Sequence, residues 1–392
     1  MTKISMKSRQ EIIKRYSAKY KKSSKKEKGQ ILDSICLSTG LSRDRVKKLL
    51  SGRIEKTAAP VSVSNPIKKR GRKPKYDNRT RVALRRLWAL MDFACGRRLA
   101  AGMEDMLNAL LRFDEIEFDK QTLENLQKIS PATIDRLLKH VKNSMNFKGI
   151  SATKPGTLLK RDIPIRLGTQ WDDAVPGYVE VDLVAHCGIT TAGEYINTLN
   201  VTDIYSGWTE TAAVVNKAQK HVFEALMTVK ERLPFPLLGI DSDNGSEFIN
   251  NHLFRYCKQE NICFTRSRAN KKNDNCYVEQ KNWSVVRRNI GYDRYEGKEA
   301  LRVMNEYYEL LRLYTNFFLP SAKLLSKSRG GAKIRKKYEP PQTPYKRLIS
   351  SSYIEKDEKK HLNEIWLTLN PVELKRGMMK LLDQLLKLRI KS

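Results

Sequence analysis

The sequence predicts an α/β protein, in which a five-stranded mixed sheet with flanking helices follows an all-helical region and precedes a small C-terminal extension. Apolar residues recur at helical spacing in much of the first 145 residues, which predicts the all-helical region. From residue 177 the pattern changes to short β-branched runs that then alternate with helical segments, which predicts the sheet and its helices. A chain of 392 residues is long enough for two or three domains.

The charge of the chain indicates a polyanionic partner. Lys and Arg number 75 against 43 Asp and Glu, a net charge of +32, and such a chain gathers around nucleic acid or an anionic membrane. No run of about 18 apolar residues occurs, and residues 1–10 lack the apolar segment of a signal peptide. The six Cys form no C-x-x-C pair, and the five His do not fall at zinc-ligand spacings. We therefore expect a cytoplasmic, nucleoid-associated protein with reduced thiols that binds DNA and no membrane.

Residues 1–56 form the first predicted domain. Residues 1–80 hold 24 Lys and Arg against 6 Asp and Glu, so +18 of the net charge lies there. The segment 29–50 predicts two helices around a turn at Gly40, with Ser42 as the N-cap of the second. This spacing is typical of a helix-turn-helix, whose second helix enters the major groove; a small basic helical hairpin with a solvated face is the alternative. The cations expected on DNA are Arg43, Arg45, Lys47 and Lys48.

Residues 57–77 are predicted to be a basic linker, because they combine prolines with Lys and Arg and show no periodicity. The segment KKRGRKPK is similar to an AT-hook, in which Arg70 and Arg72 would enter a narrow minor groove. Lys73 separates the second arginine from proline, so a plain basic linker on phosphates fits as well.

Residues 78–145 predict a second helical domain. Two amphipathic helices come first, and then Ser130 as N-cap and Pro131 at the first helical position begin another. The pattern favours a second helix-turn-helix that presents Thr133, Arg136 and Lys139 to DNA, with a purely structural helical connector as the alternative. Residues 146–176 are expected to form a linker along DNA phosphates.

Residues 177–319 predict strands and helices in the order βββαβαβα. The expected strands are YVEVDLVA, EYINTLNVTD, WTETAAVV, PLLGID and ICFT. The expected helices lie around residues 222–229 and at 248–260, 277–290 and 301–318. Residues 320–392 form a basic C-terminal extension, whose last helix carries a leucine face that packs either on the core or on another subunit.

Three acidic residues of this region predict a metal site. Asp182 lies in an apolar strand, where a charge needs a compensating partner. Asp243 lies in Asp-Asn-Gly after the fourth strand, and 35 residues separate it from Glu279 on a later helix of the pattern. Three carboxylates without a nearby basic partner indicate a hard divalent cation. Asp241 shares a strand face with Asp243 and is its rival, although the Asp-Asn-Gly context and the spacing favour Asp243.

This constellation resembles the DDE core of retroviral-type integrases and of related bacterial insertion-sequence transposases, over residues 177–319. The resemblance implies an RNase H-like fold, in which the first and fourth strands are neighbours and the last helix brings Glu279 against Asp182 and Asp243. It also implies phosphate contacts by Lys281, Arg287 and Arg288. Trp283, Val286 and Arg287 are expected to share the helix face of Glu279, with Trp283 either a core residue or a stacking platform.

The function implied by the resemblance is that of a DNA transposase. Such a homo-oligomer would bind double-stranded element ends, free their 3′-OH groups and join them to target DNA. Two Mg²⁺ or Mn²⁺ ions about 3.5–4 Å apart would be bridged by Asp182, with Asp243 and Glu279 completing one each. Two alternatives remain: a helix-turn-helix regulator with an inactive core, and an RNase H-like nuclease that cuts without joining.

Overall fold

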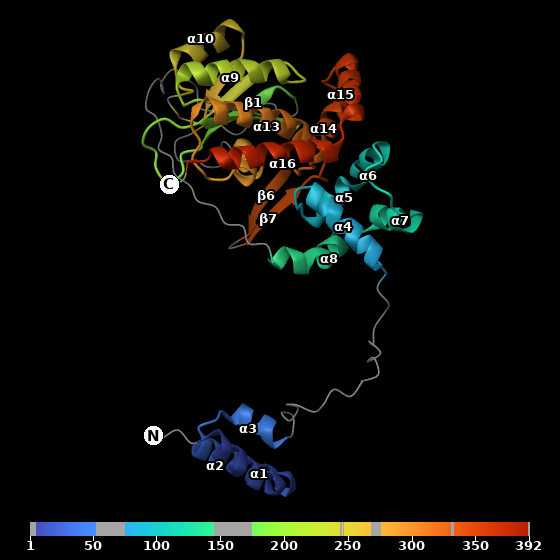
Figure 1. The fold of residues 1–392 in the computed structure, drawn as a ribbon, viewed down its shortest axis with the longest axis vertical. Helices are drawn as coiled ribbons and strands as arrows, with labels where there is room; N and C mark the ends of the chain where they lie inside the picture. Colours follow the sequence, from blue (N-terminus) through green and yellow to red (C-terminus); the bar gives the residue numbers. More distant parts are fainter. Residues whose placement is uncertain are drawn as a thin grey trace. The chain divides into compact units, whose positions relative to one another are not determined.

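The computed structural model describes residues 5–51, 75–144, 175–243, 245, 247–267, 276–330 and 333–390. The chain divides into two compact units, Met1–Lys73 and Pro74–Ser392, which we describe separately (Figure 1). The AT-hook-like segment with Arg70 and Arg72 lies outside the described residues, as does almost all of the expected linker 146–176. None of the described helices is long and apolar enough to cross a membrane.

The first unit is a small helical cluster. It consists of α1 (Met6–Lys22), α2 (Lys25–Thr39) and α3 (Arg43–Leu50), of which the sequence predicted the last two. Ser24 and Glu27 form a capping box at the start of α2, and Gly40 ends the helix with a φ of 66°. The buried core residues of this unit are Ile31, Leu32, Ile35, Val46 and Leu50.

The second unit contains the predicted five-stranded sheet, in the order β3-β2-β1-β4-β5. Its strands are β1 (Tyr178–Ala185), β2 (Asn197–Asp203), β3 (Thr209–Val214), β4 (Gly239–Ser242) and β5 (Cys263–Arg266). The strand β2 runs antiparallel to its neighbours β1 and β3, whereas β4 runs parallel to β1 and β5. This mixed topology confirms the predicted RNase H-like fold, in which the first and fourth strands are neighbours.

Helices cover both faces of the sheet. On one face, valine and leucine side chains of the sheet pack against α9 (Gln219–Arg232) and α10 (Asn251–Gln259). Successive residues of a strand point to opposite faces of the sheet. On the other face, Asp182 of β1 contacts Asn282 in the helical run that follows β5, and Thr198 of β2 contacts Tyr308 of the long helix α13 (Gly297–Phe318). That helical run consists of α11 (Cys276–Lys281), the π-helix η1 (Asn282–Arg287) and α12 (Arg288–Ile290).

The remaining helices of this unit share one hydrophobic core with α13. They are α4 (Asn78–Leu90), α5 (Gly96–Ala101), α6 (Met103–Arg112), α7 (Lys120–Lys128) and α8 (Pro131–Ser144) before the sheet, and α14 (Pro344–Ser350), α15 (Lys356–Thr368) and α16 (Pro371–Leu388) after α13. Between α13 and α14 lie the strands β6 (Leu324–Gly330) and β7 (Lys333–Tyr338), whose described residues are not part of this core. The hydroxyl of Tyr314 on α13 donates a hydrogen bond to the Leu90 carbonyl at the end of α4. Met378 and Leu385 of α16 are buried in the same core. The C-terminal helix therefore packs on its own chain, and α4–α8 are part of the body that holds the sheet.

Candidate active site

Asp182 on β1 faces the helical run that follows β5, and its side chain is half-buried. Its Oδ2 accepts a hydrogen bond from Asn282 Nδ2 at 2.6 Å, and its Oδ1 accepts one from the Leu183 backbone N–H at 2.8 Å. Asn200 lies opposite Asp182 on β2, and its Nδ2 donates to Asn282 Oδ1 at 2.7 Å. Two amides in series therefore fix the orientation of the Asp182 carboxylate.

Asp243 leaves the sheet beside Asp182, because β4 runs parallel to β1 with Ser242 opposite Val181. Its Oδ1 accepts the Gly245 backbone N–H at 2.8 Å. Asp241 is fully buried within β4, and its Oδ1 accepts a hydrogen bond from the Thr265 hydroxyl on β5 at 2.6 Å. This bond gives Asp241 a structural partner inside the sheet and favours Asp243 as the acid of the site.

Glu279 lies in the first turn of α11 with an exposed side chain. The start of this helix is held against β1 by the buried Glu180, whose Oε2 accepts the backbone N–H groups of Tyr277 and Val278, each at 2.9 Å. These donors belong to the helix start, where N–H groups lack partners within the helix and where a negative charge is favourable. Glu180 thus joins the helix that carries Glu279 to the strand that carries Asp182.

The charges of Asp243 and Glu279 both act on the carboxyl group of Asp182. Burial raises the pKa of Asp182 to about 7, and repulsion from Asp243 and from Glu279 adds to this shift. Oxygen donors that repel one another are the ligands that Mg²⁺ prefers, usually together with water and substrate phosphates. Among the residues that the structure describes, no three His, Cys, Asp or Glu side chains are already arranged around a metal position. The donor chemistry therefore fits a divalent cation that the substrate helps to bind.

The helix of Glu279 differs from the predicted uninterrupted helix 277–290. It changes at Asn282 into the π-helix η1, whose wider turn holds more residues than an α-helical turn. Glu279 is exposed and Trp283 is 51% exposed, whereas Val286 is fully buried, so the expectation that Val286 shares the face of Glu279 was wrong. Trp283 is therefore not a core residue, and Asn282, three residues after Glu279, is the side chain that reaches Asp182.

Sequence analysis missed the supporting residues Glu180, Asn282 and Asn200. Glu180 could have been found, because it lies two residues before Asp182 and therefore on the same, otherwise buried, strand face. Asn282 gave no such signal, because nothing in its sequence context distinguishes it from the other polar residues of this helix.

Residues 172–272 match the family model of the integrase core domain. Over 347 residues the chain is also 36% identical to the uncharacterized protein y4rM of Sinorhizobium fredii (strain NBRC 101917 / NGR234), a match that covers 88% of this chain and 96% of y4rM. The protein belongs to the integrase core family. Among solved structures, it is similar to the magnesium complex of the HTLV-2 integrase catalytic core in its dimeric form (15% identity, 38% of this chain and 93% of that one, TM-score 0.29). It is also similar to the BIV integrase catalytic core (16% identity, 47% and 98%, TM-score 0.29).

In this integrase core protein, three cations near Glu279 were expected to contact DNA phosphates, and two of them contact the chain itself. Arg287 donates to the Ala185 carbonyl at 2.8 Å, and its guanidinium lies 4.7 Å from the centre of the Tyr292 ring. Arg288 donates to the Asp92 carbonyl just beyond α4. These contacts tie η1 and α12 to the body.

Lys281 is the third of these cations and lies half-buried at the end of α11. Burial lowers its pKa to about 7, with further contributions from the positive charges of Arg98 and Arg347. A group of cations therefore lies beside the helix of Glu279.

The residues expected on DNA in the helical regions differ in exposure. On α3, the side chains of Arg43, Arg45, Lys47 and Lys48 are all exposed, and Arg43 forms an ion pair with Asp33 of α2. On α8, Arg136 and Lys139 are exposed. Thr133 is half-buried and accepts a hydrogen bond from Arg136 at 2.8 Å, so it is the least available of this set.

Proposed function

We propose that this protein is a DNA transposase that binds the ends of a mobile element, nicks them to free 3′-OH groups and joins these to target DNA. The proposal is supported by the placement of the three acids: Asp182 lies on β1, Asp243 directly follows the neighbouring strand β4, and Glu279 lies on α11, whose start Glu180 holds against β1. Membership of the integrase core family supports the same reaction class.

In this proposal the residues of the site hold cations and keep the ligands in position. Asp182, Asp243 and Glu279 would hold two Mg²⁺ or Mn²⁺ ions, with Asp182 shared between them. When bound, the cations would activate the attacking oxygen and stabilise the leaving one. Asn282 keeps the Asp182 carboxylate oriented, and Glu180 keeps α11 against β1. The nucleophiles are water and then the 3′-OH, so the reaction requires no nucleophilic side chain.

DNA binding would begin in the first unit. The exposed cations of α3 lie on a helix that follows a Gly turn, which is the arrangement that places a helix in the major groove. Arg136 and Lys139 on α8 offer a second contact with the same duplex. Because two element ends must be brought together, we expect the protein to act as a homo-oligomer on DNA.

The test is an assay of nicking and joining, scored separately, with labelled duplexes that carry the terminal inverted repeats flanking the gene. Asp182→Asn, Asp243→Asn and Glu279→Gln remove one metal-binding charge each and keep the side-chain size. Each should lower nicking and joining in Mg²⁺ by more than about 100-fold, while duplex binding stays nearly unchanged.

Asp241→Asn is the matched control, because an amide at this position still accepts the hydrogen bond from Thr265. It should retain activity. Activity in all three triad variants would contradict the mechanism. An inactive Asp241→Asn beside an active Asp243→Asn would reassign the second acid. Wild-type protein that nicks without joining would be a nuclease, and wild-type protein that binds ends without cutting them would be a regulator.

A further inference from the structure

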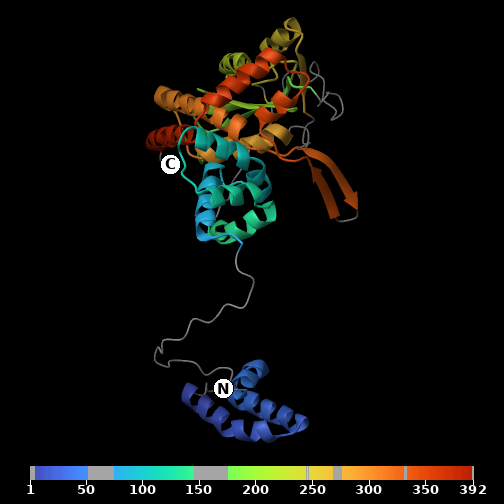
Figure 2. The same cartoon turned by 90° about the vertical axis from the view of Figure 1, so that its right-hand side faces the viewer.

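The strands β6 and β7 form a hairpin outside the main sheet. They pair with each other in a separate two-stranded sheet, and Figure 2 shows this hairpin standing out from the side of the body. A two-stranded hairpin is marginally stable in water by itself. The stability of the β6–β7 hairpin therefore depends on the contacts at its base and on any partner that it binds.

The hairpin is strongly cationic. Residues 323–338 contain seven Lys and Arg and no Asp or Glu, and the side chains of Arg335, Lys336 and Lys337 are exposed. The backbone register places Lys336 directly opposite Lys327, and like charges at opposite positions destabilise a strand pair. These cations weaken the hairpin in isolation, so their charge suits an external polyanion.

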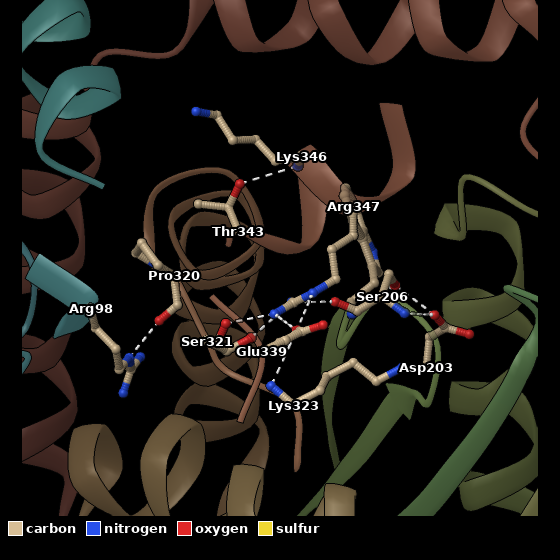
Figure 3. Close-up of polar contacts among 11 residues, drawn as sticks. Arg98, Asp203, Ser206, Pro320, Ser321, Lys323, Glu339, Thr343, Lys346 and Arg347 are labelled. Atoms are coloured by element: carbon tan, nitrogen blue, oxygen red, sulfur yellow. Dashed lines mark hydrogen bonds and ion pairs between the residues drawn. The ribbon is translucent and has the colours of Figure 1, made fainter. Parts of the chain in front are cut away.

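The base of the hairpin is anchored by a network around Arg347 of α14 (Figure 3). Its guanidinium donates to the Ser206 carbonyl at 2.9 Å and to the Ser321 hydroxyl at 3.0 Å, and its Nε donates to Glu339 Oε1 at 2.9 Å. The same carboxylate oxygen accepts the Lys323 backbone N–H at 3.1 Å. Arg347 is 7% exposed, so both ends of the hairpin are fixed to the β2–β3 turn by a buried cation.

A second arginine holds the chain just before the hairpin. Arg98 of α5 donates to the Pro320 carbonyl at 2.5 Å, three residues before Lys323. The chain that leads into β6 is therefore fixed to α5 as well as to the β2–β3 turn, so the exposed cations project from a rigid base.

We propose that the β6–β7 hairpin is a DNA-binding arm that contacts the phosphates of duplex DNA independently of base sequence. The inference rests on the proposed function, because it assigns a further contact surface for the same substrate. The cations of the arm lie on both strands, and the consecutive residues Lys336 and Lys337 point to opposite faces. Cations spread in this way suit contacts with phosphates, which carry no sequence information.

The test uses the full chain and a 30-base-pair duplex of random sequence without the inverted repeat. In the arm variant, Arg335→Gln, Lys336→Gln and Lys337→Gln are combined. Each phosphate contact that is lost should make the slope of log K against log [salt] shallower by about 0.9, so we expect a change of up to about 3. The control combines Lys356→Gln, Lys360→Gln and Lys380→Gln, three exposed cations of α15 and α16, and should keep the wild-type slope apart from a small effect of net charge.

A charge-preserving variant, with Arg335→Lys, Lys336→Arg and Lys337→Arg, separates charge from folding and should restore the slope. Equal salt slopes for the arm variant and the control would contradict the proposal that the hairpin binds DNA. A slope that is equally shallow in the charge-preserving variant would contradict it as well. If the wild type nicks and joins element ends while the arm variant binds like the control, the arm fails and the proposed function stands. If neither the wild type nor any variant nicks element ends, while only the arm variant shows a shallower salt slope, the proposed function fails and the DNA-binding role of the hairpin stands.

Discussion

Glu180 accepts two backbone hydrogen bonds from the helix start that precedes Glu279, and it does so from a buried position. Glu180→Gln keeps an acceptor oxygen but removes the charge that complements the helix N-terminus. We expect nicking to fall by roughly 10-fold to 100-fold and the Mg²⁺ concentration for half-maximal rate to rise, while duplex binding stays unchanged.

A titration of the nicking rate against Mg²⁺ checks this prediction. Glu355→Gln, an exposed carboxylate before α15, is the control and should titrate like the wild type. An unchanged Mg²⁺ dependence in Glu180→Gln would show that this carboxylate serves stability alone.

Glu210 on β3 gives the folded protein a pH-dependent stability. Burial raises its pKa from about 4.5 to about 7, although Arg312 and the Trp208 indole N–H oppose the shift. The folded state therefore keeps a proton that the unfolded state releases between these values, so the free energy of unfolding falls as pH rises from about 4.5 to about 7.

Glu210→Gln removes this contribution and retains an acceptor for Trp208. Relative to wild type, the variant should become more stable by an amount on the order of 3 kcal/mol between pH 5 and pH 8. Urea unfolding of both proteins across this range measures the difference. A difference between Glu210→Gln and the wild type that does not change with pH would contradict the prediction.

At the scale of the element, local patterns predicted the sheet well because its strands carry strong local signals. β1 has the predicted bounds, since Val179 and Val181 alternate with Glu180 and Asp182 across eight residues. β6 and β7 gave no such signal, because basic and small residues interrupt any alternation of apolar and polar side chains in LLSKSRG and KIRKKY. The π-helix η1 was equally hidden, because the sequence of the helix is compatible with an uninterrupted α-helix and the wider turn is fixed by packing against the sheet.

Gly40 ends α2 and begins the turn to α3 with a φ of 66° and an N–H that donates to the Cys36 carbonyl at 2.9 Å. A Cβ at this position would meet nothing within 4 Å, so the cost of Gly40→Ala comes from the left-handed backbone and should be about 1 kcal/mol. Hydrogen exchange in the full chain should show faster opening of α2 and α3.

Gly40→Asn is the matched control, because asparagine tolerates the left-handed region better than alanine. It should open more slowly than Gly40→Ala. Equal protection of α2 and α3 in Gly40→Ala and in the wild type would mean that the turn adopts another backbone conformation without cost.

At the scale of the whole molecule, the N-terminal unit should dominate the salt dependence of DNA binding. Removing Met1–Lys73 takes away 22 Lys and Arg and 5 Asp and Glu. Because each neutralised phosphate contributes about 0.9 to the slope of log K against log [salt], the truncated protein should show a much shallower slope. Filter binding to a random-sequence duplex at several salt concentrations measures it.

A combined variant of the full chain, with Arg45→Gln, Lys47→Gln and Lys48→Gln on α3, should give an intermediate slope. An unchanged slope after removal of Met1–Lys73 would place most phosphate contacts in the second unit.

Long-range packing was the part that local patterns could not predict. The helices α4–α8 read as a separate domain because each has an apolar face at helical spacing, but that spacing does not say which partner covers the face. In the structure the partners are α13 and α16, about 200 residues further along the chain. The site of Asp182, Asp243 and Glu279 stays a prediction, which rests on strand order and on one spacing.

Because α16 is part of the core of the second unit, the two units can complete their folds at different times during translation. The three helices of the first unit are complete once residue 50 has left the ribosome, whereas the body around the carboxylates lacks one side of its core until residues 371–388 follow. During translation, a folded N-terminal unit therefore precedes a finished catalytic centre by more than 300 residues. A chain that stops before α16 keeps the cationic helices and leaves the apolar side of α13 uncovered. Under the proposed function, an interrupted message would therefore yield fragments that compete for DNA without cutting it.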